Sequence, residues 1–206
     1  MNVKRAKKGS TRRPSPNCPP ESCSHGKRDG TILVQQGAED ELKMFSQATG
    51  ARFLAGLPGY AYDSRGGQGI TVYVIDSGIN PDLPVSVSDY QKFGNKRSLI
   101  FQEFRNMPGS LRWLYLPGEP EIRGDESGHG TCVTSKVASP TFGVAKSANI
   151  VVVKITSING MVHGTAYFGA FGVVARDIVS ENLQGKAVIN LAVNGALNQG
   201  LKYLEI

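Results

Sequence analysis

The chain has 206 residues, of which 40% are hydrophobic and 19% charged, and its formal net charge is +6. This length suits one sizeable domain, and no apolar run approaches the ~18 residues of a membrane span, so no membrane partner is expected. Residues 1–30 hold eight Lys and Arg against two acidic residues, and the rest of the chain holds 15 of each sign. Since residues 31–206 carry no net charge, a net basic surface for binding nucleic acid is not expected on the folded part of the chain.

The first 30 residues are rich in Pro, Ser and charge and contain no aromatic residue. Such a composition is typical of a solvated, disordered arm, and the missing aromatics disfavour nucleic-acid binding. The segment also lacks the apolar stretch of a signal peptide, so localisation cannot be read from it. Cys18, Cys23 and His25 supply only three of the four ligands that a structural zinc usually takes. Three alternatives stay open for Cys18 and Cys23: two uncommitted thiols, a disulfide between them, and a zinc site. The zinc site is the least favoured of the three.

The first predicted elements follow this arm. TILVQQ (31–36) predicts a short strand, and AEDELKMFSQATG a short helix that ends at Gly50. The turn-rich stretch 57–69 marks a domain boundary, because its glycines lead directly into an apolar run. We therefore expect 31–56 to be a linker or the end of an upstream segment, and 57–206 to be the main domain.

Further elements come from three β-branched runs, ITVYVI (70–75), NIVVVKI (149–155) and AVINLAV (187–193). Their composition is consistent with strands buried on both faces. A helical stripe lies between the last two runs and consists of Tyr167, Phe171, Val174 and Ile178. A strand, a helix and a second strand imply a parallel sheet with a right-handed crossover. The fold class is therefore α/β.

Two motifs carry candidate catalytic side chains. Asp76 follows the strand 70–75 in VIDSGIN, at the kind of strand end where functional side chains of α/β sheets collect. His129 stands in SGHGT before a predicted helix, in which Cys132 is expected to be a buried small residue. An Asp bonded to one imidazole nitrogen leaves the other free to act as a general base. Each motif alone also fits an ordinary turn, but the two together favour catalysis and predict a carboxylate–imidazole contact of about 2.6–3.2 Å.

The ordered series VYVIDSGI, GHGT, FGVAKSANIVVVKI and NLAVNG resembles the subtilisin-like serine proteases, or subtilases, over roughly residues 55–206. The run GQGITVYVIDSGI, with LPGYAYD before it, is most similar to the fungal secreted branch. The resemblance implies a subtilisin-like parallel sheet flanked by helices, here truncated after about four strands. It also implies serine endopeptidase activity on peptide or protein substrates, secretion and no cofactor. Asp76 would be the orienting acid and His129 the general base.

The same resemblance implies the substrate side of the site. NLAVNG matches the strand beside the primary specificity pocket, and an NGM loop matches a segment that pairs with an extended peptide. The implied substrate-binding residues are Gly160, Ala192, Val193, Asn194 and Gly195. A second HGT, with His163, matches a loop and is not a catalytic candidate. Asp82 matches a calcium ligand of some subtilases, but the loop SPTFGVAK is too short to supply the others, so no metal is expected.

The chain departs from the family pattern in three ways. Thr134 and Ser135 follow the histidine motif where small residues are usual, and Asn194 stands where a glycine is common. Asp76 and His129 are 53 residues apart, and this wide separation implies an inserted loop containing LRWLYLPGEPEIRG.

The nucleophile is the largest departure. Subtilisin holds Asp, His and Ser in that chain order, with roughly 150 residues between His and Ser. Only 77 residues follow His129, and they contain neither a Gly-Thr-Ser-Met-type motif nor the oxyanion-hole asparagine. We expect the N-terminal part of a catalytic domain, inactive alone, from a truncated gene, a broken gene model or a degenerate copy.

Two alternatives are a catalytically dead subtilase-fold binding or scaffold module and an unrelated α/β protein. In the truncated sheet, strand 187–193 would be an unpaired apolar edge. Such an edge predicts self-association.

Overall fold

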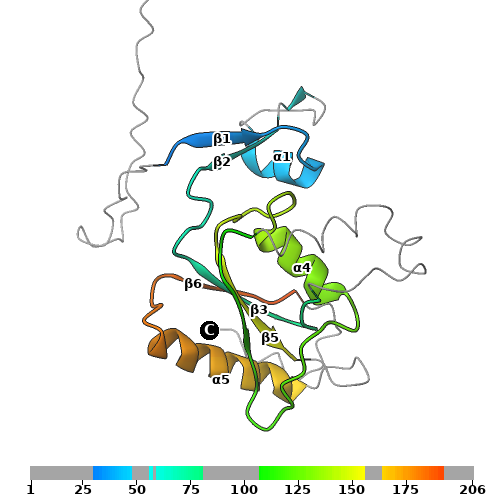
Figure 1. The fold of residues 1–206 in the computed structure, drawn as a ribbon, viewed down its shortest axis with the longest axis vertical. Helices are drawn as coiled ribbons and strands as arrows, with labels where there is room; N and C mark the ends of the chain where they lie inside the picture. The colour runs from blue at the N-terminus through cyan, green and yellow to red at the C-terminus, as the bar shows by residue number, and fades with distance from the viewer. Residues whose placement is uncertain (1–29, 48–55, 58, 81–106, 156–163, 193–206) are drawn as a thin grey trace, which may run out of the picture. The chain divides into compact units, whose positions relative to one another are not determined.

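Figure 1 shows the computed structural model of the chain, which describes residues 30–47, 56–57, 59–80, 107–155 and 164–192. The chain divides into two units, Met1–Thr31 and Ile32–Ile206. All helices and strands described below belong to the second unit. They form a four-stranded parallel sheet with helices and a two-stranded antiparallel sheet, which confirms the predicted α/β class.

The small sheet pairs β1 (Ile32–Gln35) with β2 (Tyr60–Asp63). Between them lies α1 (Asp40–Ser46), whose Leu42 is 1% exposed and packs in one cluster with Tyr60. The predicted strand and helix are confirmed, although α1 ends before Gly50. The sequence does not predict β2, because YAYD lies in a glycine-rich stretch that is typical of turns. These residues form a strand by pairing with β1, and this pairing crosses the expected domain boundary. That boundary stays a prediction.

The main sheet has the strand order β4-β5-β3-β6, and every neighbouring pair is parallel. Its strands are β4 (Leu111–Leu114), β5 (Asn149–Lys154), β3 (Thr71–Asp76) and β6 (Ala187–Asn190). β3 lies between β5 and β6, and all six of its residues are buried. A strand buried on both faces is what the β-branched run ITVYVI predicts.

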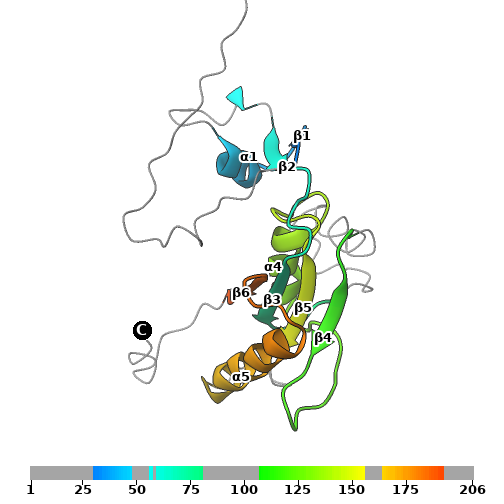
Figure 2. The ribbon, with the colours of Figure 1, turned by 90° about the vertical axis from the view of Figure 1, so that its left-hand side faces the viewer.

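Two helices cover opposite faces of this sheet (Figures 1 and 2). The side chains of a strand alternate between faces, so Val72, Val74 and Val152 contact the layer of α4 (His129–Ala138). The residues next to these in the chain point to the other face and contact the layer of α5 (Gly164–Ser180). They are Tyr73, Ile75, Val151 and Val153. The three layers place the carboxyl end of β3 beside the first turn of α4.

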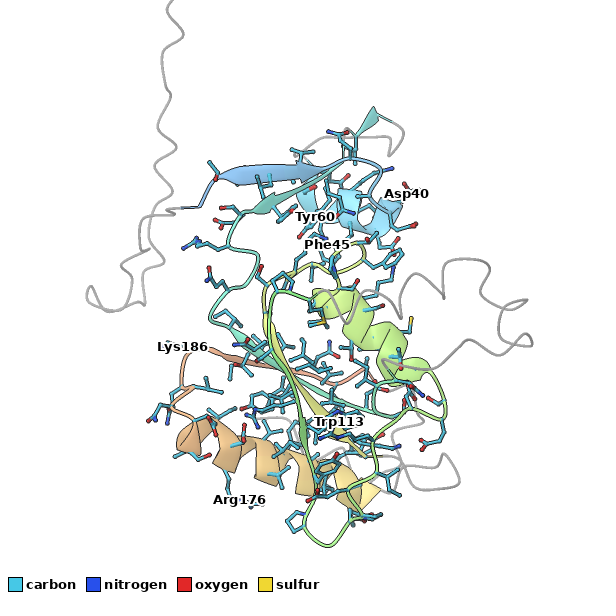
Figure 3. All side chains as sticks on the ribbon, in the orientation of Figure 1. Asp40, Phe45, Tyr60, Trp113, Arg176 and Lys186 are labelled. Carbon is cyan, nitrogen blue, oxygen red and sulfur yellow. The ribbon has the colours of Figure 1, made fainter. Side chains whose placement is uncertain are left out.

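β4 corrects the expectation that LRWLYLPGEPEIRG belongs to an inserted loop. Leu111–Leu114 pair with Ile150–Val153 of β5 and form one edge of the main sheet. Leu111 and Trp113 pack toward α4, and Leu114 packs toward α5 (Figure 3 labels Trp113). The alternation of side chains between the two faces covers only four residues and includes the charged Arg112, so the sequence alone does not predict a strand here. The strand forms by pairing with β5.

The expectation that the run 187–193 is a strand buried on both faces was wrong. β6 ends at Asn190, and its Val188 and Ile189 are 52% and 41% exposed, because an edge strand has a neighbour on one side only. The stripe predicted for α5 is confirmed at Tyr167, Val174 and Ile178, which pack in the core cluster on this face of the sheet. Phe171 is the exception and is 37% exposed.

Cys132 is exposed, contrary to the prediction that it is buried. The buried side of α4 is formed by residues at helical spacing, Thr131, Thr134, Ser135 and Ala138. Cys132 follows Thr131 by one residue, a rotation of about 100° that turns it away from the sheet.

A polar cluster joins α5 to the sheet. The Arg112 guanidinium of β4 forms an ion pair with Asp177 of α5, and the buried Tyr73 hydroxyl of β3 donates a hydrogen bond to the same carboxylate. Burial opposes ionisation of Asp177, but the bonds from Arg112 and Tyr73 outweigh it and lower the pKa of Asp177 below its ordinary 3.8. The cluster therefore holds an ionised carboxylate between layers.

Candidate active site

Asp76 and His129 are brought together by the ends of two elements. Asp76 is the last residue of β3, and His129 is the first residue of α4. The position of the Asp76 carboxylate is fixed by β3, because β3 pairs in register with a strand on each side, β5 and β6. The sequence places these residues 53 positions apart, and the fold places them in contact.

The pair has the geometry of a hydrogen-bonded carboxylate and imidazole. His129 Nδ1 lies 2.8 Å from Asp76 Oδ1 and 3.1 Å from Oδ2. The expected contact of about 2.6–3.2 Å is therefore present. Asp76 Oδ1 also accepts a hydrogen bond from the backbone N–H of Ser77 at 2.7 Å.

The two side chains differ sharply in exposure. The Asp76 side chain is 3% exposed, whereas the His129 side chain is 54% exposed. A carboxylate can only accept, so Nδ1 of the neutral imidazole carries the proton and Nε2 is the basic nitrogen. A buried acceptor behind a half-exposed imidazole is the arrangement that a general base needs.

Two glycines allow the backbones to approach this closely. A Cβ on Gly130 would lie 2.2 Å from the carbonyl oxygen of Gly78 and 3.0 Å from Asp76 Oδ1. Gly78 has φ +106°, and a Cβ there would lie 2.2 Å from the carbonyl oxygen of Gly124. The glycines around both motifs are thus required by space and by backbone conformation.

Sequence reasoning missed Asp125, which is 5% exposed beside the pair. Its Oδ1 accepts hydrogen bonds from the Ser77 hydroxyl at 2.7 Å and from the backbone N–H groups of Gly128 and Ser127 at 2.8 and 3.1 Å. Its Oδ2 accepts from the backbone and the hydroxyl of Thr131. Asp125 stands three residues before Gly128, which occupies the N-cap position of α4, so the usual N-cap signal does not identify it.

The loop that carries Asp125 is attached to β5 by Lys154. The Lys154 ammonium donates to the Gly124 carbonyl at 3.1 Å and to both carboxylate oxygens of Glu126 at 2.8 Å. This hydrogen bond from Lys154 lowers the pKa of Glu126, against the opposing effect of burial. The Glu126 side chain itself is 65% exposed.

The substrate-side expectations fall largely outside the described residues. Ala192 is half-buried two residues after β6. Gly160, Val193, Asn194 and Gly195 lie outside the described residues, as does His163. The structure therefore brings Asp76 and His129 together and leaves the implied substrate-binding residues as predictions.

The residues that the structure describes offer neither a metal site nor a membrane-spanning helix. Among them, no group of three or more His, Cys, Asp or Glu side chains could hold a metal ion, and no helix has the length and apolarity to cross a bilayer. Asp82, Cys18, Cys23 and His25 lie outside the described residues.

Comparison with known proteins agrees with this geometry. The sequence model of the Subtilase family matches residues 67–202. The chain is 32% identical to Subtilisin-like protease 2 of Pseudogymnoascus destructans over 156 residues, which is 71% of this chain and 33% of that protein. It is 34% identical to Subtilisin-like protease 3 of Trichophyton tonsurans over 143 residues, 68% of this chain and 30% of that protein.

A solved structure is similar as well. The crystal structure of a cold-adapted subtilisin-like serine proteinase matches with a TM-score of 0.52 and 25% identity, over 78% of this chain and 48% of that one. The chain thus spans about a third of the length of the curated relatives it matches. From its parallel sheet, its Asp–His contact and these similarities, we conclude that the chain belongs to the subtilase family of serine peptidases.

Proposed function

We propose that this chain supplies the acid and the base of a serine endopeptidase. Asp76 orients and stabilises the imidazole, and His129 Nε2 takes the proton of a serine hydroxyl as that oxygen attacks a peptide carbonyl. The observation that carries the proposal is the 2.8 Å contact between the His129 imidazole and the buried Asp76 carboxylate. Membership of a serine peptidase family supports it.

The nucleophile is the open part of this proposal. The serine hydroxyls closest in the chain to the pair, those of Ser77 and Ser127, both bond to the Asp125 carboxylate. The sequence contains no Gly-Thr-Ser motif. We therefore propose that the serine and the oxyanion-hole asparagine belong to the part of a family domain that this chain does not cover, and that the chain alone does not cleave peptides.

The substrate and the location of the activity follow from the resemblance and are proposals too. An extended peptide would run beside the end of β6, where Ala192 is half-buried. Val193, Asn194, Gly195 and Gly160 would complete the contact. Secretion is inferred from the fungal secreted enzymes that the sequence resembles.

The test is a complementation assay with a chromogenic peptide. The chain is assayed alone and then together with a separately expressed C-terminal segment of a fungal relative that carries the serine and asparagine motifs. We expect activity only in the mixture. There, His129→Ala should abolish it, and Asp76→Asn should lower kcat by about 10⁴-fold, as the wrong imidazole tautomer does in other serine proteases. Glu126→Gln, which changes a neighbouring carboxylate outside the pair, is the matched control.

Two outcomes would contradict the proposal. Activity of the chain alone that disappears on His129→Ala would mean that the chain carries its own nucleophile. An inactive mixture in which both segments are folded and bound to each other would favour a catalytically dead binding module.

A further inference from the structure

The proposed proton transfer assigns no role to Asp125, yet this carboxylate is almost completely buried beside it. Asp125 is 5% exposed and lies four residues before His129. Burying a carboxylate is costly unless its oxygens are hydrogen-bonded. Asp125 therefore has to be explained by what its hydrogen bonds hold.

One set of bonds holds the start of α4. The carboxylate accepts from the backbone N–H of Gly128 at 2.8 Å through Oδ1, and from the backbone N–H and hydroxyl of Thr131 at 2.8 and 2.5 Å through Oδ2. These amides belong to the helix terminus, whose N–H groups lack partners within the helix. Asp125 thus acts as an N-terminal cap for the helix that begins at His129.

A second set reaches the end of β3. The Ser77 hydroxyl donates to Asp125 Oδ1 at 2.7 Å and accepts from the backbone N–H of Gly130 at 2.9 Å. The Ser127 hydroxyl donates to that of Ser77 at 2.9 Å and accepts from the backbone N–H of His129 at 3.0 Å. The residue after Asp76 and the residues on both sides of His129 are therefore connected through one carboxylate.

We propose that Asp125 is a positioning residue for the Asp76–His129 pair. It fixes the end of β3 relative to the first turn of α4, so that Nδ1 of the imidazole stays within hydrogen-bond distance of Asp76. This inference rests on the proposed function, in which that contact selects the tautomer of a general base. A residue that only caps α4 would stabilise the helix and leave the tautomer unaffected.

The chemistry of the site requires a carboxylate. Oδ1 of Asp125 accepts from Ser77 at the strand end and from the Gly128 backbone. Oδ2 accepts from the backbone N–H and the hydroxyl of Thr131, so every group that faces the carboxylate in these bonds is a donor. An amide of the same shape has one accepting oxygen, so its NH₂ group would face donors. Asp125→Asn is therefore a disruptive change despite its small size.

The readout is the imidazole tautomer of His129, measured by NMR on the full chain with isotope-labelled histidine. The chain has three histidines, and His129→Ala assigns the signal of interest. In the wild type we expect the neutral imidazole to carry its proton on Nδ1, with a low-field Nδ1 proton resonance. Asp76→Asn should abolish that resonance and sets the scale for complete loss.

Asp125→Asn is expected to shift the tautomer toward the level of the Asp76→Asn variant and to broaden or remove the low-field proton. Glu119→Gln makes the corresponding carboxylate-to-amide change at an exposed side chain outside this loop and should leave the signal unchanged. Ser77→Ala removes the bond between Asp125 and the strand end together with the acceptor of the Gly130 N–H, but keeps the bonds from Asp125 to Gly128 and Thr131. It should also shift the tautomer. It decides the question if Asp125→Asn does not fold.

A folded Asp125→Asn variant and a Ser77→Ala variant that both keep the wild-type tautomer would overturn the inference. In the complemented enzyme, the inference predicts that Ser77→Ala lowers kcat by up to about 10²-fold, the effect of a displacement near 1 Å, and leaves KM nearly unchanged. If the complemented wild-type protein is inactive but its His129 imidazole still carries the proton on Nδ1, the result counts against the proposed function and leaves the role of Asp125 standing. The two failures are therefore distinguishable.

Discussion

At the scale of single residues, Asp177 is a largely buried carboxylate outside the site that pairs with Arg112 and accepts a hydrogen bond from Tyr73. The Asp177 side chain is 11% exposed, so its ionised form depends on these two partners. A carboxyl whose pKa is lower in the folded than in the unfolded chain makes stability rise with pH. Its contribution is complete above the unfolded pKa, near 3.9, and is lost as the pH falls through the lower folded value.

The first prediction concerns this carboxylate. Asp177→Asn should lower the free energy of unfolding by about 1–3 kcal/mol at pH 7, the usual worth of hydrogen bonds to a charged group. The difference between wild type and variant should shrink as the pH falls below about 4. Urea unfolding at several pH values measures it. Asp40→Asn, at a 67% exposed side chain in a surface pair, is the control and should change stability little. A constant difference across the pH range would contradict the prediction.

The sequence predicts some residues of the site and not others, for a physical reason. Asp76 and His129 stand in short motifs, so each could be found from its chain neighbours. Asp125 acts through Ser77, which is 48 positions away in the chain, and only the folded backbone brings them within 2.7 Å. A role that depends on a distant partner leaves little trace in local sequence.

At the scale of elements, α4 carries a buried hydroxyl that no group in the described part of the chain satisfies. Thr134 is 0% exposed, and its hydroxyl has no hydrogen-bond partner among the described residues. Thr131, one turn earlier, is 2% exposed and donates its hydroxyl to Asp125. The same side chain at two positions of one helix therefore has opposite energetic consequences.

We expect Thr134→Val to raise the free energy of unfolding by about 1 kcal/mol, because it removes an unsatisfied buried hydroxyl and keeps the side-chain shape. Thr131→Val is the matched comparison and should lower the free energy by about 1–3 kcal/mol, since it removes a bond to a charged group. Urea midpoints of the full chain measure both. Changes of the same sign would show that the hydroxyl of Thr134 has a partner or that helix propensity dominates.

Which elements the sequence predicts follows from how each obtains its stability. β3 and β5 are long β-branched runs and α5 is a long periodic segment, so local composition is enough to locate them. β4 has four residues with a charge in second place, and it becomes a strand by pairing with β5. The apolar composition of β6 does not reveal whether the strand lies inside the sheet or at its edge, so its exposure does not follow from the sequence.

At the scale of the whole molecule, the edge at β6 predicts self-association between copies of the chain. Within the described residues β6 pairs only with β3, and Val188 on it is 52% exposed. Val188→Lys should shift sedimentation velocity profiles toward the monomer, because a charge on an edge strand opposes strand pairing. Val179→Lys makes the same change on α5 at a 63% exposed side chain and should have little effect. Equal effects of both would indicate a general gain in solubility and would count against pairing at the edge.

The central position of β3 also affects how the protein comes to be folded. Thr71 pairs with Asn149, which is made 78 residues later, and with Ala187, which is made 116 residues later. At about 5–20 residues per second, a nascent β3 waits roughly 4–16 s on the ribosome for its first neighbour. Its apolar side chains stay uncovered by a partner strand during that time. Assembly of the sheet that holds the Asp76–His129 contact is therefore a late, high-contact-order event, and synthesis rate and chaperones become part of what determines the yield of folded protein.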